Sequence, residues 1–186
     1  MRKMLCGTTV LLLAGLVALP LAAQQAKPAD AKPAVSGVRG EVLRQIDAAR
    51  DKLIALAEAT PADKYTWRPN DKVRTVGEVY AHVAGGNYFL PTLWGVKVPE
   101  GVDPRGFDKL AADKAKTIDT LKKSYEHVHH VIESTADADL AKSIKLFDHE
   151  GTVLEGLLII GSHGHEHLGQ SIAYARSVGI VPPWSQ

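Results

Sequence analysis

The sequence predicts an all-α protein, a four-helix bundle behind an export signal and a flexible tether. Four segments repeat apolar residues at spacings of three and four, which is the period of an amphipathic helix. No segment is convincing as a strand. Helices with one apolar face each bury those faces against one another around a single core. We therefore expect one folded domain, at residues 38–186.

The N-terminus has the layout of a secretory signal peptide, expected at residues 1–23. Arg2 and Lys3 precede an uncharged apolar run at residues 9–19, which is shorter than the about 20 residues of a membrane-spanning helix. We expect cleavage after Ala23, leaving a periplasmic or secreted protein with no stable membrane span. A retained N-terminal anchor is the alternative, because signal and anchor segments differ only by degree.

Composition limits the kinds of site and partner that are expected. Cleavage would remove Cys6, the only cysteine, so any metal in the mature protein must be bound by nitrogen and oxygen atoms. Residues 24–37 are rich in Ala, Lys and Pro and are expected to form a flexible tether. The chain has 22 basic and 21 acidic residues, a net charge of +1, which does not favour nucleic acid as a partner.

The first two predicted helices are recognised by their ends and their apolar faces. The first stops at Thr60 and Pro61, and its apolar stripe consists of Val42, Ile46, Ala49, Leu53 and Leu56. The second begins where Thr75 and Glu78 have the spacing of a capping box. His82 lies on the apolar face of this second helix. Its imidazole is predicted to point inward, which is unusual unless something binds it there.

The third and fourth predicted helices are longer amphipathic segments. The third is expected to begin near Phe107, with an apolar stripe of Leu110, Ile118, Leu121, Tyr125, Val128 and Ile132. The fourth is expected to begin after Gly151 and to end before Gly179, with an apolar stripe of Val153, Leu157, Ile160, Leu168 and Ile172.

Two histidines of the fourth helix have the spacing of a metal-binding pair. His163 and His167 are four residues apart, so their imidazoles lie one above the other, about 6 Å apart, and can bind one ion. His165 projects toward another edge of the helix and is a poor third ligand. His82 is the histidine already turned inward, and three neutral imidazoles leave a coordination position for water or substrate. The alternative is a pair of unrelated histidines on a helix surface.

Several segments resemble proteins of the DinB family. Residues 67–69, 74–78 and 82–88 are similar to that family's loop and second helix, and residues 163–170 are similar to its fourth helix. The resemblance extends over nearly all of the predicted domain. It implies a four-helix bundle with a long crossover connection, a homodimer, and a divalent metal bound by one histidine of the second helix and two of the fourth. Those ligand roles fall on His82, His163 and His167.

The sequence departs from the family pattern at two positions close to the predicted ligands. Leu168 stands where an arginine commonly precedes the Gly-Gln pair, and Glu166 stands where another histidine is frequent. Neither departure removes a ligand. The family includes thiol-dependent S-transferases and isomerases beside members of unknown activity, so the resemblance implies the site more closely than the reaction.

Other polar residues have two interpretations each. Glu78 either caps its own helix or accepts a hydrogen bond from His82 as a supporting partner, and capping is favoured. Gln170 either orients bound water or faces solvent. Three further histidines are expected on a solvated face of the third helix: His127, His129 and His130. A di-iron site built on the third helix is disfavoured, because no second set of inward carboxylates accompanies it.

Two classes of function follow from these residues. The first is a metal-dependent hydrolase or thiol S-transferase acting on a small molecule, in which the metal activates a water or a thiolate. The second is a non-catalytic metal-binding or small-molecule-binding protein of the cell envelope. Zinc is expected first, and nickel or ferrous iron would accept the same three imidazoles. The sequence assigns no catalytic residue, and export favours hydrolysis or an envelope-specific thiol.

Overall fold

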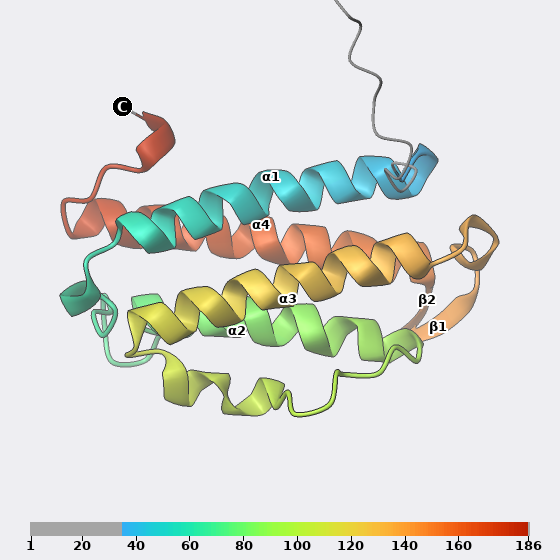
Figure 1. The fold of residues 1–186 in the computed structure, drawn as a ribbon, viewed down its shortest axis with the longest axis horizontal. Coiled ribbons are helices and arrows are strands. Elements are labelled where there is room, and N and C mark those ends of the chain that lie inside the picture. Colours follow the sequence, from blue (N-terminus) through green and yellow to red (C-terminus); the bar gives the residue numbers. More distant parts are fainter. Residues whose placement is uncertain (1–34, 186) are drawn as a thin grey trace, which may run out of the picture. The chain divides into compact units, whose positions relative to one another are not determined.

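The computed structural model describes residues 35–185; the predicted signal peptide and most of the predicted tether lie outside them. Four α-helices lie alongside one another (Figure 1): α1 (Gly37–Ala59), α2 (Val76–Phe89), α3 (Lys114–Ser134) and α4 (Val153–Ser177). Short 3-10 helices connect or follow them: η1 (Ala62–Lys64), η2 (Leu90–Trp94), η3 (Pro104–Leu110), η4 (Asp137–Asp139) and η5 (Pro183–Ser185). Within residues 35–185 no helix is both long and apolar enough to span a membrane.

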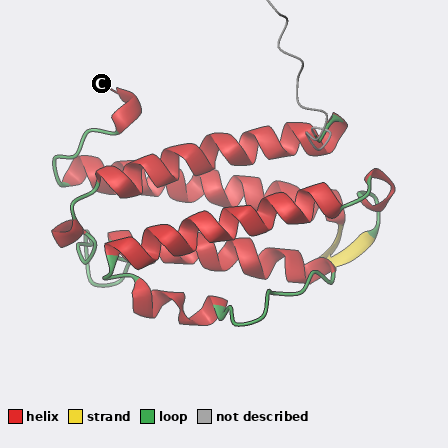
Figure 2. Cartoon of the chain, in the orientation of Figure 1, coloured by secondary structure: helices red, strands yellow, loops and turns green. Residues whose placement is uncertain are grey.

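A small antiparallel sheet, absent from our prediction, precedes α4. Strands β1 (Ser143–Leu146) and β2 (His149–Thr152) pair between α3 and α4 (Figure 2). The protein is mostly helical, as predicted, with one hairpin that the prediction did not include. The strands are only four residues long, and Phe147 at their turn has a positive φ of 49° without being glycine. Strand β1 alternates polar and apolar residues over only four positions, and β2 does not alternate, so the period-two signal is too short to indicate a hairpin in the sequence.

The four helices form a ring in which each packs on two others. Helix α1 contacts α3 and α4, and helix α2 contacts the same two. Figure 1 shows α1 and α4 running one way and α2 and α3 the other. Because α2 and α3 run in the same direction, the connection at residues 90–113 returns along the molecule, and η3 within it packs on α2. Every helix contributes a fully buried aliphatic residue to the core: Leu53, Val83, Leu121 and Leu157.

The third helix begins later than predicted. The stretch expected to open it forms η3 and a turn, and α3 begins at Lys114 after Asp113, whose side chain accepts a hydrogen bond from the Lys116 N–H. Asp is a strong N-cap residue because its oxygen satisfies a free N–H at the helix start. The apolar residues Phe107 and Leu110 belong to η3, although their spacing seemed to continue the helical stripe of α3.

Two of the three histidines expected on a solvated face of α3 are less exposed than predicted. His127 is buried and stacks on Tyr88 with ring centroids 4.9 Å apart. His129 is half-buried, and its Nε2 lies 2.6 Å from a carboxylate oxygen of Asp47. Only His130 is exposed. The prediction failed because α3 packs against both α1 and α2, so more than one of its faces is covered.

Helix α2 begins with the capping box that the sequence predicts, formed by Thr75 and Glu78. The Thr75 hydroxyl accepts a hydrogen bond from the Glu78 N–H at 3.2 Å, and the Glu78 carboxylate accepts one from the Thr75 N–H at 2.7 Å. Thr75→Ala is expected to lower the free energy of unfolding by ~1 kcal/mol, because a helix N–H loses its partner. Thr66→Ala, in an exposed turn nearby, should change it by less than about 0.5 kcal/mol. Urea denaturation of the two variants tests this difference, and equal stabilities would contradict it.

Candidate metal centre

Three histidines from two helices meet where α2 packs on α4. His82 belongs to α2, and His163 and His167 lie one turn apart on α4. One ring nitrogen from each of the three can be chosen so that all lie within 4.8 Å of one another. The Nε2 atoms of His82 and His163 are 3.1 Å apart. Within residues 35–185 no other group of three or more His, Cys, Asp or Glu side chains converges in this way.

The rings stand edge to face, which suits ligands around one ion. Their centroids are 4.9 Å apart for His82 and His163, 4.7 Å for His82 and His167, and 4.6 Å for His163 and His167. The interplanar angles are 71°, 86° and 83°. Nitrogen ligands at about 2.05 Å from a tetrahedral zinc ion are about 3.3 Å apart. The observed 3.1 Å between two Nε2 atoms is close to that separation.

A glycine allows the two helices to approach this closely. A Cβ atom at Gly86 of α2 would lie 2.5 Å from Cε1 of His163, which is too near for any side chain. The Nδ1 atom of the His163 ring is buried without a hydrogen-bond partner. The Nε2 atom of His163 is therefore the one that faces His82.

Gln170 supports the third histidine of the cluster. The Nδ1 atom of His167 lies 2.8 Å from Gln170 Oε1, and Gln170 Nε2 donates to the Tyr174 hydroxyl at 3.0 Å. Because an amide oxygen can only accept, Nδ1 of His167 carries the proton and its Nε2 keeps a free lone pair. Such an outer hydrogen bond fixes the tautomer and the ring orientation of a metal ligand. Glu78, the other predicted supporting residue, is engaged in the cap of α2.

Burial keeps two of the imidazoles neutral at physiological pH. It lowers the pKa of His82 to about 4, with the positive charge of Arg74 as a further cause. It also lowers the pKa of His163 to about 4, and the neighbouring His167 and His82 rings add to that effect. Desolvation disfavours the imidazolium form because its charge loses contact with water. Neutral imidazoles present the lone pairs that a metal ion needs.

These lowered pKa values predict how the metal-free protein responds to acid. A histidine of the unfolded chain titrates near its ordinary value of about 6.5, so between about pH 6.5 and about pH 4 the unfolded chain binds more protons than the folded one. The free energy of unfolding should therefore fall as the pH falls through this window. Urea denaturation of chelator-treated protein at several pH values measures the slope. His163→Asn should make the slope shallower than in the parent protein, whereas equal slopes would contradict the prediction.

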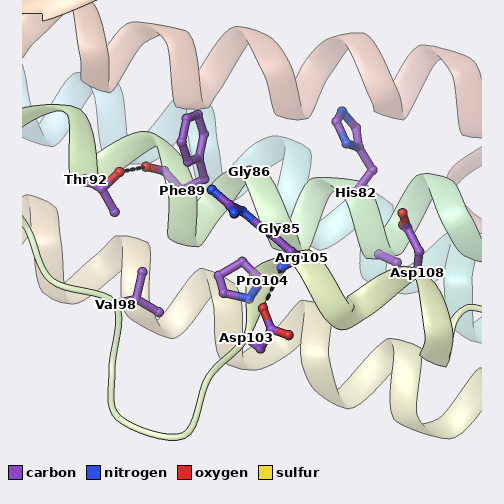
Figure 3. A pocket seen from close by; sticks show the side chains of 11 residues that line it. His82, Gly85, Gly86, Phe89, Thr92, Val98, Asp103, Pro104, Arg105 and Asp108 are labelled. Atoms are coloured by element: carbon purple, nitrogen blue, oxygen red, sulfur yellow. Dashed lines mark hydrogen bonds between the residues drawn. The ribbon is translucent and has the colours of Figure 1, made fainter.

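A cavity of about 770 Å³ opens beside His82, and through it small molecules can reach the histidine cluster. Its floor is the surface of α2, and residues of η3 and the preceding loop form its wall (Figure 3). Asp108 of η3 lines this cavity and also a second, more polar one of about 550 Å³ that contains Arg74 and Gln170. The histidine cluster is thus bordered by solvent-accessible space on the side of the crossover connection.

Three residues of α4 next to the ligands, discussed in the sequence analysis, lie outside the histidine cluster: His165, Glu166 and Leu168. His165 is exposed, and its Nε2 lies 3.1 Å from the backbone oxygen of Gln45 on α1, away from the cluster. Leu168, at the position where an arginine is common, is part of the buried core, and Glu166 is exposed. The sequence prediction missed Arg74 and Asp108, whose approach to His82 depends on how the loops fold. A basic or acidic loop residue carries no periodic signal.

Comparison with known proteins agrees with this architecture. The chain is similar to the crystal structure of a DinB-like protein from Bacillus subtilis, with 17% sequence identity, a TM-score of 0.53, and coverage of 78% of this chain and 98% of that one. At this identity the likeness concerns the fold. No curated protein matches the chain. A family model described as the DinB superfamily matches residues 45–171, which include all three clustered histidines. The chain therefore belongs to the DinB superfamily.

Proposed function

We propose that this protein is an exported metalloprotein, a four-helix bundle that binds one divalent ion through His82, His163 and His167. The observation that carries the proposal is the convergence of three imidazoles from α2 and α4, with ligand atoms within 4.8 Å of one another. The lowered pKa values of His82 and His163 and the hydrogen bond from His167 to Gln170 support it further. Zinc suits three neutral imidazoles best, and nickel or ferrous iron would also be accepted.

The cavity beside the cluster favours a catalytic role over simple storage. A divalent ion bound by three protein ligands keeps a position for a water or a thiol and lowers the pKa of that group. The protein contributes the fixed orientation of the imidazoles and a space of about 770 Å³ next to His82, which is large enough for a small organic molecule. We therefore propose a metal-dependent hydrolase or thiol S-transferase.

Metal analysis of the full chain, expressed without an affinity tag, tests the proposal directly. We expect about one divalent ion per chain, because the cluster offers a single three-imidazole site. The metal-loaded and chelator-treated forms are then compared on esters, amides and pairs of thiols with electrophiles. Turnover lost on chelation and restored by one metal would support an enzyme. Bound metal without turnover on any class would support a non-catalytic binding protein, and absence of metal would contradict the proposed site.

The proposed export rests on residues outside the described part of the chain and has its own test. The charged, apolar and small-residue segments of residues 1–23 have the order of a cleaved signal. N-terminal sequencing of protein recovered from the periplasm or the medium is expected to begin near Gln24. A soluble cytoplasmic pool that retains Met1 would contradict cleavage, and a membrane-bound pool that retains it would support the anchor instead.

A further inference from the structure

The face of α2 that carries His82 forms a groove with a glycine floor. His82, Gly85, Gly86 and Phe89 line one cavity, and their spacings of three and four place them along one face of the helix. The two glycines add no side chain between the imidazole at one end and the aromatic ring at the other; the His163 ring lies against Gly86, and the backbone oxygen of Pro104 lies close to Gly85. The seven steps along the helix from His82 to Phe89, at about 1.5 Å each, give a groove about 10 Å long. A bound molecule that reaches the histidine cluster can therefore extend along α2 to Phe89.

The two ends of this groove differ in character. Phe89 is 47% exposed although it is a large aromatic residue, and Val98 of the crossover connection lines the same end of this cavity. Figure 3 shows the side chain of Arg105 extending from η3 past the glycines toward Phe89. Asp108, in contrast, is drawn near His82 in the same view. An apolar surface and a guanidinium thus lie at the end remote from the histidines.

The Arg105 guanidinium forms no ion pair among the described residues, although the Asp103 carboxylate lines the same cavity. Within residues 35–185 its side chain also makes no hydrogen bond, and its backbone N–H donates to Asp103 Oδ1 at 3.2 Å. The Asp103 carboxylate thereby caps the start of η3. In the metal-free protein the other carboxylate of the cavity, Asp108, would repel an anion from the His82 end. An anionic group therefore finds its favourable partner at Arg105, where a planar guanidinium can bind a carboxylate through two hydrogen bonds.

We infer that the groove accepts an organic anion of about 10 Å, with its carboxylate on Arg105, its apolar body against Phe89 and its reactive group next to His82. This inference rests on the proposed function, because it assigns a substrate class to the same metal centre. Phe89 supplies contact area without selecting a particular ring or chain, whereas Arg105 distinguishes a charged ligand from a neutral one of equal shape. A neutral analogue should fill the groove but bind less tightly.

The test compares 3-phenylpropionate with 3-phenylpropionamide, which differ in charge and hardly in shape. Dissociation constants are measured by NMR titration of the full chain, both metal-loaded and chelator-treated, so that direct binding of the carboxylate to the ion is separated from binding to Arg105. We expect the carboxylate to bind at least about 10-fold tighter than the amide in both forms, since charge-assisted hydrogen bonds exceed neutral ones. In the chelator-treated form Arg105→Gln should reduce this ratio to near unity, and in the metal-loaded form it should reduce the ratio to the part that direct binding to the ion supplies.

Two control variants make the outcome specific. Arg176→Gln removes an exposed arginine of α4 that does not line this cavity and should leave the ratio unchanged. Phe89→Ala should weaken both probes while preserving the ratio. An equal ratio in the parent and in Arg105→Gln, or no preference in the parent, would overturn the inference. Metal content is measured on the same samples. Bound metal without a preference for the anion would contradict the groove inference and leave the proposed metal centre intact. A preference for the anion without bound metal would support the groove and contradict the metal centre.

Discussion

Gly77→Ala is expected to lower the free energy of unfolding by ~3 kcal/mol, at the upper end of the range for overpacked sites. Gly77 is the second residue of α2, and a Cβ atom there would collide with the backbone oxygen of Ala111, just after η3. Its N–H also donates to the backbone oxygen of Tyr65 at 2.9 Å. The helix start is thus held between two backbone segments, and neither can move aside as a flexible side chain would.

Gly169→Ala is the matched control for this prediction. Gly169 lies inside α4, and an added Cβ would meet nothing within 4 Å. There the same substitution should raise stability by ~0.5–1 kcal/mol, because alanine loses less backbone freedom in a helix than glycine. Thermal unfolding of both variants in the presence of a chelator measures the difference without a contribution from metal. Equal melting temperatures for the two would show that the chain around Gly77 can relax.

The ends and faces of α1, α2 and α4 could be predicted because local signals mark them. Pro61 stops α1, Thr75 and Glu78 cap α2, and Gly179 with φ of 79° follows α4. Each of these residues acts on its own backbone or on a neighbour within one turn. The start of α3 was misplaced because two apolar residues of η3 have helical spacing. Tertiary packing on α2 holds them there, and sequence spacing does not record that packing.

The histidine cluster was predictable for the same reason and its surroundings were not. The spacing of His163 and His167 places them one turn apart on any helix, and the apolar face of α2 turns His82 toward the interior. The groove depends instead on where the crossover connection returns along α2. Arg105 and Asp108 lie in that connection, in a segment without periodicity, so only the folded structure brings them to the cavity beside His82.

The metal centre itself gives the second large expected effect. Replacing any one of His82, His163 and His167 with alanine should remove most of the bound metal, because two imidazoles hold an ion far less well than three. His165→Ala is the matched control: it removes a histidine from the same helix as two of the ligands, but one whose ring contacts α1. Elemental analysis of the untagged variants, purified side by side, measures the loss.

The same variants link metal binding to folding. An ion that binds only the folded chain stabilises it by roughly 4 kcal/mol when the free metal is about a thousand times its dissociation constant. For a domain of this size that is on the order of 10 °C in melting temperature. Chelation should therefore lower the melting temperature of the parent protein and of His165→Ala by that amount, and barely change it in the three ligand variants, which have little metal to lose. Equal metal content in His82→Ala and His165→Ala would show that His82, and with it α2, contributes no ligand to the site. The 3.1 Å approach of His82 to His163 would then be a packing contact between two neutral rings, with no ion shared between the helices.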